Sequence, residues 1–129
     1  MTVATLAAWH RVLASRDLAA LNELLADNAV FHSPVVHKPQ VGKPLTAMYL
    51  AGAMQVLGNE SFRYVREVVG SRDAVLEFQL EIDGVSINGV DLIHWDESGR
   101  IDDFKVMLRP LKAVNLVHQK MAELLAAGR

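Results

Sequence analysis

The amino-acid sequence predicts a single α+β domain, in which a cone-shaped, curved antiparallel sheet carries N-terminal helices on its concave face and a further helix at its C-terminus. Three observations lead to this prediction. Apolar residues recur at helical spacing up to residue 58, alternate with a period of two over residues 61–109, and return to helical spacing over 110–127. Four long consecutive strands must twist and curl, and helices across a curled sheet enclose a natural pocket.

The first half of the chain is expected to form three helices and a short strand. The first helix covers residues 3–15, with Leu6, Trp9 and Leu13 on its apolar face. Asp17 is the expected N-cap of a second helix, and residues 29–32 form a short strand that Pro34 stops. The inner face of this second helix is expected to carry Leu18, Leu21, Leu24 and Leu25.

A third helix is expected after the loop-like residues 37–42. Pro44 suits its first position, and Gly58 stands where a C-terminal glycine is expected. Its inner face is predicted to comprise Leu45, Met48, Tyr49, Gly52 and Val56.

The second half predicts an antiparallel meander followed by a last helix. Asp83-Gly84 between alternating runs is a strong hairpin signal. Gly89, inside a strand, indicates a bulge or a close approach of another group. The four strands are expected at residues 61–69, 73–83, 85–96 and 100–109, and the last helix begins at Pro110.

Length and composition exclude several classes of protein. A chain of 129 residues, 51% hydrophobic and 22% charged, is expected to form one globular domain spanning residues 1–129. A net charge of −2 without a basic patch argues against nucleic-acid and membrane partners. The absence of cysteine excludes disulfides and thiolate chemistry. With no secretory signal and no apolar run of about 20 residues, we expect a cytoplasmic protein.

Asp91 is the lead candidate for a functional residue, because it shares one side of its strand with apolar side chains. An acid in an apolar pocket has a raised pKa, since desolvation disfavours its charged form. The alternative is a structural core aspartate satisfied by Asn88, His94 or a backbone amide. The residues on its side of the strand are Val85, Ile87, Gly89, Asp91, Ile93 and Trp95.

Two stretches resemble the nuclear-transport-factor-2-like superfamily, which includes SnoaL-like polyketide cyclases, ketosteroid isomerases and limonene-epoxide hydrolases. They are RDLAALNELLADNAVFHSP, residues 16–34, and GVDLIHWDESGRIDDF, residues 89–104. The resemblance covers about residues 3–109 and implies the cone fold with a small-molecule pocket. It implies chemistry less closely, because one fold hosts many reactions.

The chain matches only some of the catalytic residues of the families that it resembles. Asp91 stands where ketosteroid isomerases carry an oxyanion-hole aspartic acid, whereas Ser33 replaces their general base and Trp9 replaces their helix tyrosine. Lys105 and Val106 replace two members of the epoxide hydrolases' Asp-Arg-Asp set. Of the three comparisons, that with the SnoaL-like cyclases requires the fewest matching residues, because these enzymes need one acid in an apolar pocket.

Other residues are candidates with ordinary alternatives. His32 is predicted to pair with Asp91 as a general base if it faces inward, and otherwise to bind loop backbone. Asp102 and Asp103 are expected to point to opposite faces, flanking a turn, and so not to work together. Core packing is the alternative role for the aromatic and methionine side chains among the predicted substrate-binding residues. These residues are Trp9, Ser33, Tyr49, Met54, Phe62, Phe78 and Phe104.

Two functions therefore remain open. One is an isomerase, cyclase or hydrolase that uses acid/base catalysis on an apolar, oxygen-bearing small molecule. The other is a non-catalytic ligand-binding or dimerisation module on the same fold. We expect a homodimer through the mixed face that carries Val90 and Leu92. No cofactor and no metal is expected, because neither HxH nor HExxH spacing occurs.

Overall fold

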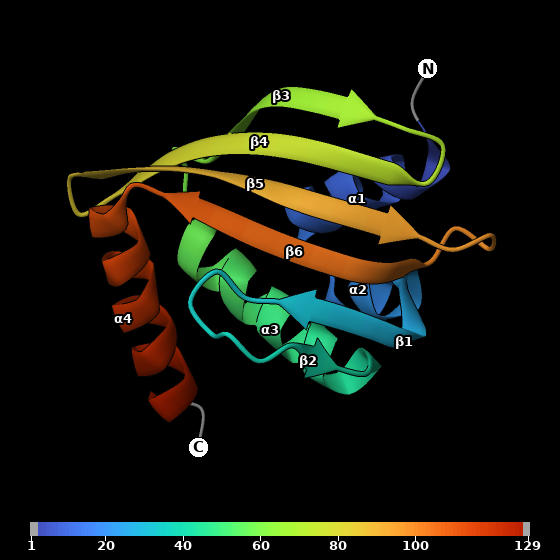
Figure 1. Ribbon diagram of the computed structural model, residues 1–129, viewed down its shortest axis with the longest axis horizontal. Coiled ribbons are helices and arrows are strands. Elements are labelled where there is room, and N and C mark those ends of the chain that lie inside the picture. Colours follow the sequence, from blue (N-terminus) through green and yellow to red (C-terminus); the bar gives the residue numbers. More distant parts are fainter. Residues whose placement is uncertain (1–2, 128–129) are drawn as a thin grey trace.

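The computed structural model describes residues 3–127 and confirms the predicted α+β architecture (Figure 1). Over these residues the chain forms four helices and one six-stranded sheet. The helices are α1 (Ala4–Ser15), α2 (Leu18–Leu24), α3 (Lys43–Leu57) and α4 (Leu111–Ala127). The strands are β1 (Leu25–His32), β2 (Gln40–Val41), β3 (Arg63–Val69), β4 (Asp73–Ile82), β5 (Val85–Trp95) and β6 (Ile101–Arg109).

The sheet has the order β2-β1-β6-β5-β4-β3. Strands β3 to β6 form the predicted antiparallel meander, and Ile82 pairs with Val85 across the Asp83-Gly84 hairpin. Strand β1 begins at Leu25, earlier than expected, and lies parallel to β6, so the sheet as a whole is mixed. Helices α1, α2 and α3 cover one face of the sheet, whereas no helix in residues 3–127 covers the other (Figure 1). We call these the inner and outer faces.

The N-terminal helices begin and end largely as the sequence predicts. Asp17 caps α2, because its carboxylate accepts the amide protons of Ala19 at 3.0 Å and Ala20 at 3.2 Å. Leu6 and Trp9 of α1 are buried, as are Leu21 and Leu24 of α2. The prediction was wrong for Leu18, which opens α2 and is mostly exposed.

The predicted inner face of α3 was wrong for Leu45 and Met48, whereas Gly52 is buried and Tyr49 and Val56 are partly buried against the core. Leu45 and Met48 are 40% and 48% exposed. The face toward the sheet instead includes Thr46, whose hydroxyl donates to the Ala29 carbonyl oxygen at 3.0 Å. A polar side chain thus holds a core position while two of the predicted apolar side chains are exposed, which the apolar pattern did not indicate. Gly52 faces α4, since a Cβ there would lie 3.3 Å from Met121.

The strand irregularities matter for the site. The β5–β6 register shifts between His94 and Trp95, so that both Ile101 and Phe104 point inward. The two residues between them therefore do not flank a turn, as expected, but lie within β6. Gly89 pairs continuously with Phe78 and Leu108 on its two neighbouring strands. Of the two alternatives for Gly89, the structure therefore shows close approach and no bulge.

Candidate functional site

Asp91 lies on the inner face of β5, as its strand pattern predicts, and is only 6% exposed. It pairs with Leu76 on β4 and Val106 on β6, both of which are buried. Ile87 and Ile93 on the same strand are also buried. The carboxyl group is thus surrounded by apolar side chains of three strands.

A chain of two hydrogen bonds ties Asp91 to helix α1. The Tyr64 hydroxyl donates to Asp91 Oδ2 at 2.6 Å, and Trp9 Nε1–H donates to the Tyr64 oxygen at 3.0 Å. The hydroxyl proton of Tyr64 is therefore committed to Asp91. Trp9, which the resemblance places at the position of a catalytic tyrosine, reaches the acid only through Tyr64.

Burial changes the acidity of both groups in this chain. It raises the pKa of Asp91 from 3.8 to about 7, and the hydrogen bond from Tyr64 opposes this change. Burial also raises the pKa of Tyr64 well above 10, and the neighbouring Asp91 carboxylate adds to the effect. Asp91 consequently exchanges a proton near neutral pH, while Tyr64 remains a neutral hydrogen-bond donor.

A cavity of about 480 Å³ opens between α1, α3 and the sheet, and Asp91 lines it. Its volume suits a small organic ligand. Asp91 has Tyr64 as its one side-chain partner within residues 3–127, where no fully buried side-chain oxygen or nitrogen lacks a hydrogen bond. The second carboxyl oxygen, Oδ1, must therefore keep some access to the cavity.

Aromatic rings form much of the cavity wall. Phe62 stacks on Phe78 with ring centroids 5.2 Å apart, and both rings meet Tyr64 at steep angles. Trp9 packs against Phe104 with ring centroids 4.9 Å apart. The other apolar lining side chains are Leu13, Ala14, Leu50, Ala53, Met54, Leu57 and Val106. The wall of the cavity is therefore largely apolar.

Polar side chains lie among the lining residues that remain accessible to solvent. They are His10, Arg16, Asn59 and Arg63. The Arg16 guanidinium donates to the Gly58 carbonyl oxygen at the end of α3, which links two helices beside the cavity. Arg63 donates to the side chain of Gln79 at 3.1 Å. The lining is thus apolar around Asp91 and polar at the residues that face solvent.

Five of the predicted substrate-binding residues line this cavity, and their role in binding stays a prediction. They are Trp9, Met54, Phe62, Phe78 and Phe104. Tyr49 is not among the lining residues and stacks on Phe31 at 5.9 Å. Ser33 lies elsewhere, where its hydroxyl oxygen accepts the amide protons of Val35 and Val36. Both residues are corrections to the predicted cavity.

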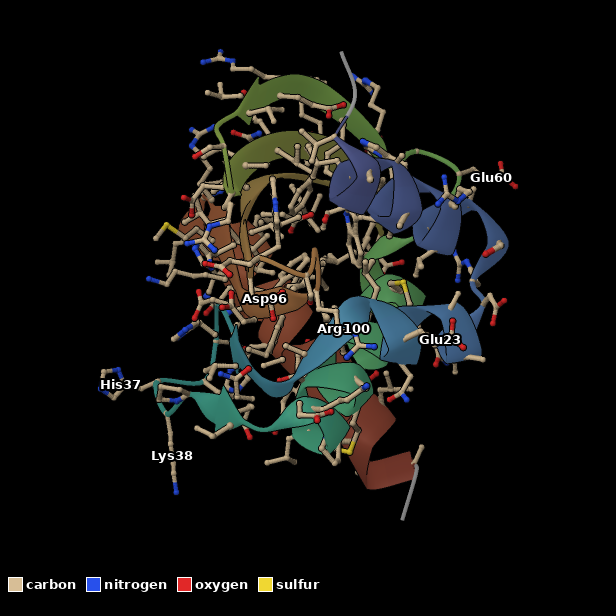
Figure 2. The ribbon with its side chains drawn as sticks, turned by 90° about the vertical axis from the view of Figure 1, so that its right-hand side faces the viewer. Glu23, His37, Lys38, Glu60, Asp96 and Arg100 are labelled. Carbon is tan, nitrogen blue, oxygen red and sulfur yellow. The ribbon has the colours of Figure 1, made fainter. Side chains whose placement is uncertain are left out.

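The predicted pair of Asp91 with His32 does not form. Phe31 points inward opposite Phe104, so its neighbour His32 points to the outer face by strand alternation. There His32 Nε2 lies 2.8 Å from Asp103 Oδ1. The predicted base at the end of β1 therefore has no support in the geometry. Figure 2 shows His37, on the loop after β1, pointing outward from the body of the molecule.

The register shift between β5 and β6, a β-bulge in β6, also corrects the expectation that Asp102 and Asp103 point to opposite faces. Both lie between the inward-pointing residues of β6, and both bind histidines: Asp102 lies 2.5 Å from His94 Nδ1, and Asp103 binds His32. The hydrogen bond from Asp102 raises the pKa of His94. These two pairs belong to the outer face and not to the cavity.

Sequence reasoning missed Tyr64 and His10. A signal for Tyr64 was present: a buried aspartate needs a donor, and the hairpins place Tyr64, Phe78 and Gly89 in one row, two residues from Asp91. A β-bulge between Tyr64 and Arg66 disturbs the alternation of β3 and obscured this signal. The sequence held no such signal for His10, because the packing of α1 against the sheet decides which face of that helix meets the cavity.

A curved sheet with helices on its inner face and one buried acid in an apolar cavity are features of the cone-type α+β fold. Comparison with known families makes this specific. The SnoaL-like domain family matches residues 6–104, and the chain belongs to this family. No functionally curated protein matches the sequence.

Solved structures agree with this assignment. The chain is 40% identical to a protein described as a steroid delta-isomerase from Pseudomonas aeruginosa, with a TM-score of 0.90, covering 96% of this chain and 90% of that one. An uncharacterised protein with a cystatin-like fold from Silicibacter pomeroyi is 34% identical, with a TM-score of 0.87, covering 95% of this chain and 86% of that one.

A more distant structure has the same fold. It is the epoxide hydrolase/cyclase-like enzyme SalBIII of pyran ring formation in salinomycin, 18% identical with a TM-score of 0.64, covering 81% of this chain and 88% of that one.

Between residues 3 and 127, no helix combines the length and the apolar character needed to cross a membrane.

Proposed function

We propose that the protein is a small enzyme of the SnoaL-like type that moves a proton on an apolar, oxygen-bearing molecule, with Asp91 as its acid. The observation that carries this proposal is the position of Asp91 in an apolar cavity, with a pKa of about 7 and one oxygen accessible. A catalytic acid works best when its pKa lies near the working pH. A core aspartate without a function has no such requirement.

The chemistry follows from the protonated form of Asp91. A ligand carbonyl, ether or epoxide oxygen beside Oδ1 would receive its proton or a strong hydrogen bond as negative charge develops there. The Tyr64 hydroxyl does not donate to the ligand in this arrangement, because its proton is held by Asp91 at 2.6 Å. It acts as a positioning residue that fixes the carboxyl and limits the rise of its pKa.

Among the reactions that this acid could support, isomerisation through an enol is favoured. The 40% identical protein is described as a steroid delta-isomerase, and the apolar cavity fits a ring-bearing ligand of this kind. Cyclisation and epoxide opening need the same acid and are the alternatives. The proposal invokes neither a cofactor nor a metal.

The test is turnover of β,γ-unsaturated cyclic ketones, whose conjugated products absorb in the ultraviolet. We expect the Asp91→Asn variant to lose about 100-fold or more in kcat, the usual contribution of a general acid. Asp103→Asn is the matched control, because Asp103 lies on the outer face, and it should retain kcat. Equal rates for Asp91→Asn and the unaltered protein would contradict the proposal.

A second, non-catalytic role is favoured by the outer face of the sheet. No helix of residues 3–127 covers this face (Figure 1). The strand register places apolar side chains at its centre. They are Val75, Val90, Leu92 and Met107. We propose that two copies of the chain associate through this face as a symmetric homodimer.

Sedimentation tests the dimer. The unaltered protein should sediment at twice the monomer mass at micromolar concentration, and Met107→Glu should shift it to monomer. Leu111→Glu places the same charge on a residue that is 74% exposed, outside this face, and should leave the mass unchanged. A monomer for the unaltered protein would rule out this association.

A further inference from the structure

We propose that His10, positioned by Glu67, is the base that works opposite Asp91. The inference deepens the proposed function and rests on it, since it names the second proton-transfer group of the same cavity. A double-bond shift needs a group that removes a proton from carbon while an acid stabilises the oxygen. The resemblance expects this base at Ser33, which the structure places outside the cavity.

The cavity lining leaves few residues for the role. Within residues 3–127 the ionisable lining side chains are His10, Arg16, Arg63, Tyr64 and Asp91. The arginines stay charged and cannot accept a proton. Tyr64 has a strongly raised pKa and holds its proton in the bond to Asp91. Imidazole is the side chain that most readily takes and returns a proton near neutral pH.

The position of His10 fits this role. It follows Trp9 on α1, and its ring meets the edge of the Tyr64 ring with centroids 5.5 Å apart and an interplanar angle of 81°. Tyr64 in turn donates to Asp91, so that one tyrosine side chain separates the base from the acid. Both groups line the same cavity, and one ligand over the Tyr64 ring could contact both.

Glu67 on β3 orients the imidazole ring of His10. Its Oε1 lies 3.3 Å from His10 Nε2, and the side chains of His10 and Glu67 are 36% and 41% exposed. A carboxylate there favours the tautomer with the proton on Nε2, which leaves Nδ1 to accept a proton. Glu67 is therefore a positioning residue, and its exposure limits its contribution.

The step balances without a further reagent. His10 Nδ1 removes a proton from the carbon between the carbonyl and the double bond, and that electron pair forms the enol C=C as the carbonyl oxygen gains negative charge. Asp91 donates its hydrogen bond to this oxygen. The imidazolium then returns the proton to the distal carbon of the former double bond, and the carbonyl re-forms. No electrons are gained or lost.

The experiment compares His10→Gln, Glu67→Gln and His118→Gln with the unaltered protein on the same β,γ-unsaturated ketones. His118 is an exposed histidine on α4 and is the matched control. We expect His10→Gln to lose about 100-fold in kcat and the acidic limb of its pH profile, because a protonated imidazole cannot act as a base. Glu67→Gln should lose less, and His118→Gln nothing.

Binding of 2-naphthol, an aromatic enol mimic, separates the two proposals. We expect His10→Gln to bind it about as well as the unaltered protein, because Asp91 holds the oxygen, and the bound naphthol should shift the imidazole NMR signals of His10 but not those of His118. Full activity of His10→Gln, with loss in Asp91→Asn, would overturn the role of His10 alone. An unaltered protein that neither turns over the ketones nor binds naphthol would overturn both proposals.

Discussion

Replacement of Asp91 by asparagine is expected to stabilise the fold at pH 8 by about 4 kcal/mol, while removing the acid that the proposed reaction needs. One pKa unit corresponds to about 1.4 kcal/mol, and burial raises the pKa of Asp91 from 3.8 to about 7. The folded protein therefore holds a carboxylate at high pH only at a cost. Asparagine has no such cost and still offers an oxygen to the Tyr64 hydroxyl.

The sign of the pH dependence follows from linkage. Between pH 3.8 and about 7 the folded state binds the Asp91 proton more tightly than the unfolded state does. The contribution of Asp91 to stability is therefore complete below pH 3.8 and is lost as the pH rises through about 7. The advantage of Asp91→Asn should be near zero at pH 4 and largest at pH 8.

Urea unfolding of both proteins at pH 4 and pH 8 measures this difference. Asp103→Asn is again the control, because Asp103 is partly exposed and bound to His32, and it should show no such gain at pH 8. An Asp91→Asn variant that is less stable than the unaltered protein at pH 8 would mean that the carboxylate is favourable in the fold. A residue that lowers the stability of the fold in this way is typical of a functional site.

Replacement of Gly89 by alanine is expected to destabilise the fold by about 2–3 kcal/mol, because the site has no room for a methyl group. A Cβ at position 89 would lie 2.6 Å from Phe78 Cζ, 2.6 Å from the Met107 carbonyl oxygen and 2.8 Å from Leu108 Cδ2. The carbonyl oxygen belongs to the neighbouring strand, so relief requires the β5–β6 pairing to shift.

The same change should reach the cavity. Phe78 is a wall residue that stacks on Phe62, and a displaced ring would alter the space beside Asp91. We expect weaker binding of 2-naphthol together with a lower urea midpoint. Gly70→Ala is the matched control: its nearest neighbour would be the Asp73 carbonyl oxygen at 3.4 Å, an ordinary contact. Equal stability of the Gly89 and Gly70 variants would show that β5 and β6 adjust freely.

The features that sequence reasoning recovered depend on neighbouring residues. Alternation along residues 74–82 and 85–95 identifies two strands and their inner face, and the Asp83-Gly84 turn sets their register. The burial of Asp91 follows from that register. Asp17 caps α2 through amides only two and three residues away. Each of these inferences needs no knowledge of distant contacts.

The features that sequence reasoning missed depend on packing between segments that are distant in the chain. The pairing of β1 with β6 decides where His32 points, and the bulge in β6 sends two successive aspartates to one face. The partner of Asp91 is 27 residues away and is reached through two hairpins. His10 belongs to the cavity only because α1 lies beside Tyr64 on β3. None of these positions follows from local periodicity.

The most direct test of the account is the titration of the Asp91 side-chain carboxyl by carbon-13 NMR, with its signal assigned by its loss in Asp91→Asn. The account predicts a midpoint of about 7, because burial dominates over the hydrogen bond from Tyr64. A midpoint near the ordinary value of 3.8 would contradict it, because Asp91 would then be charged at neutral pH and could not act as the acid.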